Sequence, residues 1–114
     1  ALLGVRVGRR FAGAAVELVG AAAPIYLLAN AADTAAGATT GERRRYTRHW
    51  TPVHLDFAVA DLDQAIAQAL AAGATLDGPA RTRPWGRIAV LADPFGNGFC
   101  LIQFLGRGYD EVAT

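Results

Sequence analysis

The chain of 114 residues contains no serine, no lysine and no methionine, and its only cysteine is Cys100. Without serine, nucleophilic catalysis by a serine hydroxyl is excluded. A single cysteine cannot form an internal disulfide, and its place within an apolar stretch predicts a buried structural thiol in a reducing compartment. Because the chain begins at Ala1 and holds no methionine, we expect that residues are missing upstream.

The chain also has almost no excess of charge of either sign, and it has no apolar run of the kind that spans a membrane. Its 11 basic and 10 acidic residues give a net charge of +1, which is too small to draw it onto nucleic acid or an anionic membrane. Residues 11–32 are apolar overall, but Glu17, Pro24 and many small residues argue against a membrane span. The sequence therefore predicts a cytoplasmic protein of one domain whose partner is a small neutral or mildly charged molecule.

The clearest secondary-structure pattern is a strand followed at once by a helix. Residues 53–59 alternate along the chain, which predicts a half-buried strand with His54 and Asp56 on one face. Asp61 then provides a helix N-cap, and apolar residues recur at helical spacing as far as Gly73. This second segment is typical of an amphipathic helix.

Three further strands are predicted after this helix, at residues 74–76, 87–92 and 99–105. The segment 93–98, Asp-Pro-Phe-Gly-Asn-Gly, predicts a tight turn. Aspartate can bond the backbone ahead of it, proline presets φ, and glycine and asparagine tolerate positive φ. Together these elements describe one βαβββ unit over residues 51–105.

The first part of the chain repeats some of this plan. Residues 1–4 have the character of a helix end, and strand patterns follow near residues 5–11, 14–19 and 25–28, but the opening strand and most of the helix are missing. We therefore divide a single domain into four segments: an incomplete first βαβββ module at 1–30, a linker at 31–50, the second module at 51–105 and a tail at 106–114.

Four local patterns of the second module together resemble the vicinal oxygen chelate superfamily, which includes glyoxalase I, the bleomycin-resistance proteins and the extradiol dioxygenases. They are the strand that carries His54, a helix ending in Ala-Gly-Ala-Thr, a Trp-Gly-Arg strand start and the Asp-Pro-Phe-Gly-Asn turn. The resemblance implies an α+β fold whose paired βαβββ modules form a curled mixed sheet around a cavity. It also implies a homodimer, since a second subunit often completes that cavity.

In metal-using members of the superfamily, the opening strand of a module supplies a histidine and the closing strand a glutamate. His54 matches the opening-strand ligand, and we assign Gln103 to the closing-strand position. A neutral amide is a weak donor and takes up no proton at neutral pH. His54 and Gln103 are therefore the candidate metal ligands of a degenerate site, and the sequence favours a pocket-lining histidine over a bound divalent metal.

Other residues of the second module are candidates for ligand binding. Asp56 shares the face of His54 and either orients its ring or is solvated. Trp85 and Arg87 offer an indole face and a guanidinium for a planar or anionic ligand, or else cover the core edge and form an ion pair. Alternation also predicts an apolar pocket wall with one polar group, formed by Phe99, Leu101 and Gln103.

A basic patch with interleaved aromatic residues occupies residues 43–50. Taken by itself, this pattern is typical of contact with phosphate backbones. Its place in a linker of a nearly neutral chain favours a solvated hinge instead, so we expect no nucleic-acid partner.

Two functions agree with these patterns, and a third, an interaction module without a ligand, is favoured only if side chains fill the cavity. The leading hypothesis is a glyoxalase/bleomycin-resistance-like protein that binds a small organic molecule in a sheet-lined cavity without metal-dependent catalysis. The alternative is a metal-dependent lyase, isomerase or dioxygenase of the same superfamily, whose remaining ligands come from upstream residues or a partner subunit. Whether the chain is an enzyme stays open at this point.

Overall fold

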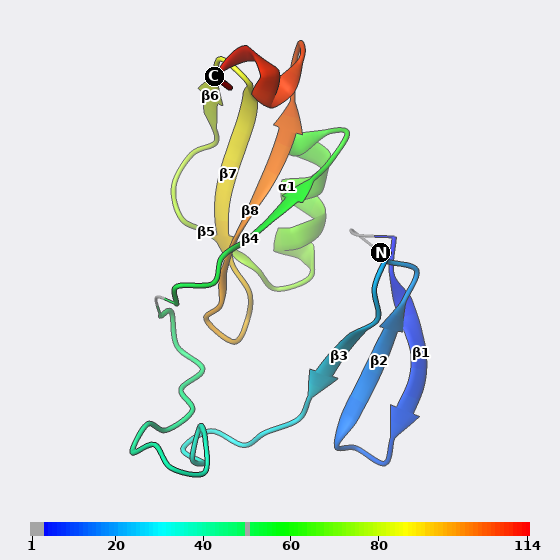
Figure 1. Cartoon of the computed structure of the whole chain (residues 1–114), viewed down its shortest axis with the longest axis vertical. Helices are drawn as coiled ribbons and strands as arrows, with labels where there is room; N and C mark the ends of the chain where they lie inside the picture. Colours follow the sequence, from blue (N-terminus) through cyan, green and yellow to red (C-terminus); the bar gives the residue numbers. More distant parts are fainter. Residues whose placement is uncertain (1–3, 50) are drawn as a thin grey trace. The chain divides into compact units, whose positions relative to one another are not determined.

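The computed structural model describes residues 4–49 and 51–114, and the chain forms two compact units (Figure 1). The first unit is Ala1–Arg45 and the second is Tyr46–Thr114. The boundary between them falls inside the segment 31–50 that the sequence predicts as a linker. Among the described residues, no helix is long and apolar enough to cross a membrane.

The second unit contains a mixed five-stranded sheet with one α-helix. Its strands run in the order β4-β8-β7-β5, and β6 pairs with β7. β4 is parallel to β8, and the other pairs are antiparallel. The elements are β4 (Leu55–Ala58), α1 (Leu62–Ala71), β5 (Thr75–Leu76), β6 (Arg81–Arg83), β7 (Gly86–Ala92), β8 (Gly98–Phe104) and the 3-10 helix η1 (Gly108–Glu111).

These elements confirm the predicted βαβββ unit, with three differences. β4 is shorter at both ends than the strand predicted over 53–59. β6 lies between the strands predicted at 74–76 and 87–92, where the sequence predicted no strand, and η1 lies in the predicted tail. Both additions are short, and neither carries a periodic pattern long enough to be recognised from sequence.

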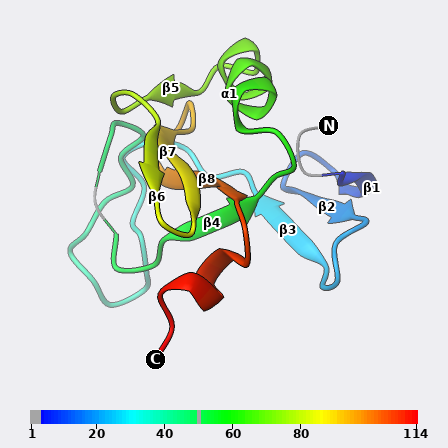
Figure 2. The same ribbon diagram turned by 90° about the horizontal axis from the view of Figure 1, so that it is seen from above.

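Helix α1 begins and ends where its local sequence predicts. The Asp61 side chain accepts a hydrogen bond from the Gln64 backbone N–H at 3.0 Å, which satisfies one of the free donors of the first turn. Gly73 follows the helix at φ +96°, a conformation that costs glycine little. α1 packs on β7 and β8, and Figure 2 shows α1 and η1 on opposite sides of the sheet.

Much of the core of the second unit lies between α1 and the sheet, although Ile102 is also buried on the opposite face. Leu62 on the helix and Leu91 and Leu101 on the sheet are fully buried. Side chains alternate along β8, so Leu101 points toward α1 and its neighbour Cys100 points to the opposite face. This alternation fixes which side chains are left for the face opposite α1.

The turn between β7 and β8 is held as the sequence predicts. The Asp93 carboxylate accepts hydrogen bonds from the backbone N–H groups of Phe95 and Asn97, at 2.8 and 2.9 Å. Gly96 has φ +86°, and a Cβ there would collide with the backbone of Thr47. The segment before β4 therefore packs on this turn, so the end of the predicted linker belongs structurally to the second unit.

The first unit is an antiparallel three-stranded sheet in the order β1-β2-β3. Its strands are β1 (Arg6–Phe11), β2 (Ala15–Val19) and β3 (Ile25–Leu28), close to the three predicted runs. Within residues 4–45 the structure contains no helix. Most of the helix end predicted at 1–4 lies outside the described residues. The described part thus agrees with an incomplete first module.

A charged cluster occupies one face of this first sheet. Glu17 on β2 is only 7 % exposed, and its carboxylate accepts hydrogen bonds from Arg9 Nε and Nη2 at 2.9 and 2.7 Å. Tyr26, which pairs with Glu17 across the strands, donates its hydroxyl to the same carboxylate at 3.1 Å. The hydrogen bond from Arg9 lowers the pKa of Glu17 to about 2, although desolvation opposes the shift.

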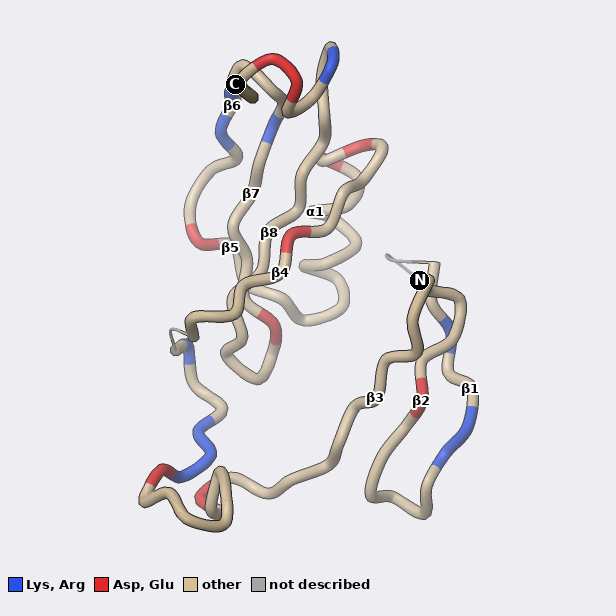
Figure 3. Tube along the Cα trace, viewed as in Figure 1, with Lys and Arg blue, Asp and Glu red and all other residues tan. Residues whose placement is uncertain are grey.

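The connection between the two sheets contains a small hairpin. Backbone hydrogen bonds join residues 33–36 to residues 42–44, and the guanidinium groups of Arg43 and Arg44 bond backbone carbonyls of the same loop. Arg48 pairs with Asp77 at 3.1 Å. Figure 3 shows basic positions along β1 and in this connection. Three of the arginines in the basic patch thus have partners within the chain.

Leu101→Ala tests the position of the core. Because Leu101 is 0 % exposed, its removal leaves a cavity under α1, and we expect a loss of about 2–5 kcal/mol of unfolding free energy. Leu70→Ala is the matched control, since Leu70 is 44 % exposed on the same helix-sheet unit and should change stability little. Urea denaturation followed by circular dichroism measures both. Equal losses would contradict this assignment of the core.

The low pKa of Glu17 predicts that the stability of the first unit depends on pH in the acid range. Its pKa is about 2 in the folded chain and 4.5 ordinarily, so the ionised carboxylate stabilises the first unit at neutral pH. That stabilisation is lost as the pH falls from about 4.5 toward about 2. Glu17→Gln should lower stability at neutral pH and flatten the dependence across this window. Amide hydrogen exchange of β1 and β2 measures both effects, and an unchanged pH profile would refute them.

Candidate functional site

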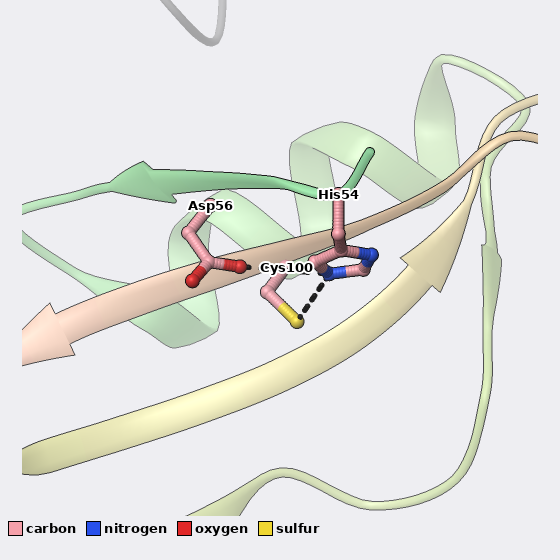
Figure 4. Close-up of side chains that lie close together, drawn as sticks. All are labelled: His54, Asp56 and Cys100. Atoms are coloured by element: carbon pink, nitrogen blue, oxygen red, sulfur yellow. Dashed lines mark hydrogen bonds and ion pairs between the residues drawn. The ribbon is translucent and has the colours of Figure 1, made fainter. Parts of the chain in front are cut away.

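Three side chains meet on the face of the second sheet opposite α1. Asp56 on β4 pairs directly with Cys100 on β8 in the parallel register, so their side chains lie on the same face. His54 precedes Asp56 by two residues and points the same way. Figure 4 shows the three side chains directed toward one another, with α1 behind the strands. We call His54, Asp56 and Cys100 the strand cluster.

The strand cluster is half open to solvent. His54 Nε2 lies 3.2 Å from Cys100 Sγ and 3.5 Å from Asp56 Oδ1. The side chains of His54 and Asp56 are 44 % and 47 % exposed, whereas Cys100 is buried. An incoming molecule would therefore meet the imidazole and the carboxylate first and the thiol beneath them.

Burial and a neighbouring charge keep the thiol of the strand cluster protonated. Desolvation is the largest cause that raises the pKa of Cys100 from 9.0 to about 11, followed by the negative charge of Asp56 and a side-chain hydrogen bond to it. At neutral pH the thiol is thus a poor nucleophile. This agrees with the predicted buried thiol, but sequence reasoning missed that Cys100 belongs with His54 and Asp56.

Gln103 lies on the other face of β8. Its Oε1 accepts a hydrogen bond from the backbone N–H of Leu62 at 3.1 Å, at the first turn of α1. Gln103 therefore satisfies a free helix donor and does not approach His54. The structure corrects the sequence-based pairing: Cys100, and not Gln103, is the closing-strand residue beside the histidine.

Arg87 and Trp85 have partners inside the second unit. The Arg87 guanidinium holds the Asp63 carboxylate through two hydrogen bonds, at 3.0 and 2.8 Å, and this lowers the pKa of Asp63. The Trp85 ring packs against Phe104 and Tyr109, with centroid distances of 6.4 and 5.1 Å. In both cases the structure shows the packing or ion-pair alternative that the sequence left open.

Phe99 and Leu101 share the face of Gln103, as alternation predicts. That face is covered by α1, and Leu101 is part of the core beneath it. The Phe99 ring packs edge-on against Phe57, with centroids 6.0 Å apart. Of the seven candidate ligand-binding residues, the structure thus brings together His54 and Asp56 and adds Cys100 to them. The signal available from sequence was the alternation of 99–103, which sets Cys100 apart from its neighbours.

The strand cluster offers three different donor atoms that could hold a metal ion. An imidazole nitrogen, a carboxylate oxygen and a sulfur all lie within 4.8 Å of one another. Donors around one tetrahedral zinc ion are about 3.3–3.8 Å apart, given metal-ligand distances of about 2.0–2.3 Å. The His54 distances of 3.2 and 3.5 Å are close to these values, so the residues present fit such an ion.

Comparisons with known proteins agree with this fold. Residues 1–102 match the family model described as a glyoxalase-like domain. No curated protein matches the chain. The chain is similar in fold to the fosfomycin resistance protein FosX from Listeria monocytogenes, with TM-score 0.64, 16 % identity, and coverage of 98 % of this chain and 80 % of that one.

Two further solved structures show the same likeness. A glyoxalase/bleomycin resistance protein from Albidiferax ferrireducens has TM-score 0.59 and 20 % identity, covering 91 % of this chain and 79 % of that one. TnmS3, an antibiotic binding protein from Streptomyces sp. CB03234, has TM-score 0.52 and 22 % identity, covering 91 % and 78 %. At these identities the likeness concerns the fold.

Gln103→Leu separates a structural role from a binding role. Removing the acceptor of the Leu62 N–H should destabilise the chain by about 0.5–2 kcal/mol, as for other lost helix caps. The NMR chemical shifts of the His54 ring should not change, because Gln103 lies on the other face of the sheet. Changed His54 shifts with unchanged stability would contradict the assignment of Gln103 to α1.

Alkylation of the single thiol tests its electrostatic surroundings. Because burial and Asp56 raise the pKa of Cys100 to about 11, iodoacetamide should react slowly at neutral pH, and the rate should still increase above pH 9.0. Asp56→Asn removes the negative charge, so it should speed the reaction at a given pH. Intact-mass spectrometry follows the single adduct, and urea-unfolded chain provides the reference rate. A slower reaction in Asp56→Asn would contradict the proposed cause.

Proposed function

Since this chain belongs to the glyoxalase-like domain family, we propose that it binds a small organic molecule at the strand cluster. The observation that carries the proposal is the convergence of His54, Asp56 and Cys100 on the sheet face opposite α1. A site of this kind needs a few converging polar groups to orient a ligand. The strand cluster supplies a hydrogen-bonding imidazole and a carboxylate acceptor, both reachable from solvent.

The chemistry of the strand cluster limits the ligand. His54 can donate to or accept from a carbonyl or hydroxyl group, and Asp56 accepts from hydroxyl or amine groups. The similar solved structures are those of a fosfomycin resistance protein, a glyoxalase/bleomycin resistance protein and an antibiotic binding protein. These names support a small polar organic molecule as the ligand class for this chain. A nearly neutral chain also suits such a ligand better than a polyanion.

We include a homodimer and a reducing compartment in this proposal. β4, which carries Asp56, is at the end of the strand order, so a second copy could lie beside the strand cluster. A site that contains a free thiol requires reducing conditions, as in the cytoplasm. Analytical ultracentrifugation at several protein concentrations tests the dimer. A mass of one chain at every concentration would contradict this part of the proposal.

Ligand binding is tested by thermal stability in the presence of a chelator. Dicarbonyl and aromatic compounds, with fosfomycin and bleomycin, serve as probes. A compound at 100 times its dissociation constant should stabilise the chain by about 2.7 kcal/mol. His54→Ala should remove this stabilisation, whereas His49→Ala should retain it, because the His49 ring bonds the Thr47 carbonyl outside the strand cluster. Stabilisation that is equal in both variants would place the ligand elsewhere.

A second candidate function is a metal-dependent lyase, isomerase or dioxygenase. The observation that favours it is the presence of three donor types within 4.8 Å. A divalent metal bound there would polarise a substrate oxygen. His54, Asp56 and Cys100 would hold the metal, and substrate would reach it from the exposed side of His54 and Asp56. Turnover of a dicarbonyl or catechol substrate that a chelator abolishes and a metal restores would favour this function over simple binding.

A further inference from the structure

The donors of the strand cluster come from a single βαβββ unit. His54 and Asp56 belong to the opening strand segment and Cys100 to the closing strand, and the parallel pairing of β4 with β8 brings them together. This set differs from the histidine and glutamate pair that the superfamily resemblance implies. Its distinguishing member is a sulfur atom at the position facing the histidine.

We propose that the strand cluster is a thiolate-containing site for a soft divalent metal ion of the zinc type. His54 Nε2, one Asp56 carboxylate oxygen and Cys100 Sγ are its three protein ligands. The inference rests on the proposed function in one respect: the same face that receives the organic molecule receives the metal. The two can nevertheless be tested separately, because metal binding requires no organic ligand.

The types of donor determine which ion is selected. Thiolate and imidazole favour zinc and cobalt over magnesium and calcium, which require sets of oxygen ligands. The Cys100 thiol is protonated in the free chain and would release its proton to solvent as the ion binds. The resulting thiolate and the ionised Asp56 carboxylate would together balance the two positive charges of the ion. Three protein ligands leave one position of a tetrahedral ion open, and a zinc ion held in this way supplies Lewis acidity at that position.

The burial pattern also suits an ion that enters from solvent. Cys100 lies buried at the base of the strand cluster, and the exposed side chains of His54 and Asp56 lie above it. Because these two side chains are about half exposed, small rotations can adjust their distances without disturbing the core. Gln103 is excluded from the set, since it bonds the first turn of α1 on the other face.

Titration of the 114-residue chain with cobalt(II) tests the sulfur ligand directly. We expect one cobalt ion per chain, with a near-ultraviolet thiolate-to-cobalt charge-transfer band that zinc abolishes by displacement and magnesium does not. Cys100→Ser should lose this band, because it is the only cysteine of the chain. A band that persists in Cys100→Ser, or the absence of any such band in the wild-type chain, would overturn the proposal.

Competition with a zinc-sensitive dye measures the other two ligands. His54→Ala and Asp56→Asn should each weaken zinc binding at least about 100-fold, since even outer residues of metal sites cost about 10–100-fold. His49→Ala is the matched histidine control and should bind zinc as the wild type does. Both ligand variants change exposed side chains, so they keep the test valid if Cys100→Ser fails to fold. Equal zinc affinities in His54→Ala and His49→Ala would overturn the proposal.

The two proposals fail in different ways. If cobalt and zinc bind as described but no organic probe stabilises the chain, the metal site stands and the proposed function fails. If organic probes stabilise the chelated protein in a His54-dependent manner but no charge-transfer band appears, the proposed function stands and the metal site fails.

Discussion

The parallel pairing of β4 with β8 is the constraint on which the candidate site depends. It sets Asp56 opposite Cys100 and leaves His54 beside them. Because strand side chains alternate, a slip of one residue would bring Leu101 to His54 and bury Cys100 under α1. Such a slip would take the fully buried Leu101 away from α1, so the packing of the helix favours the observed register. The hydrophobic core thus helps to select the residues that form the polar site.

Polar side chains on the covered face have a different task. Arg87 and Gln103 are paired across β7 and β8, and both contact the first turn of α1. Arg87 binds the Asp63 carboxylate, and Gln103 accepts from the Leu62 N–H. Together they fix the start of the helix over the sheet. The position of a polar residue on a strand near a candidate site is therefore not enough to assign it to that site. The face of the sheet on which its side chain lies must also be known.

Local chemistry made most of the fold predictable. The cap at Asp61, the stop at Gly73 and the turn bonded by Asp93 each depend on residues near one another in sequence, and the structure confirms all three. The site was less predictable, because assigning its third member required knowing which residue of β8 faces β4. Counting along the closing strand from a family pattern placed Gln103 there, whereas the register places Cys100. The docking of residues 46–49 on the β7–β8 turn likewise depends on distant contacts.

The sequence by itself determined the element types, the superfamily resemblance and the prominence of His54, because these follow from periodicity, turn chemistry and local motifs. Only the tertiary structure decided that Cys100 joins His54 and Asp56 and that Arg87 and Gln103 serve α1. The physical reason is that strand pairing and helix packing assign each side chain to a face. The burial of apolar side chains drives this assignment. It brings together residues more than 40 positions apart, such as His54 and Cys100, which no local sequence pattern relates.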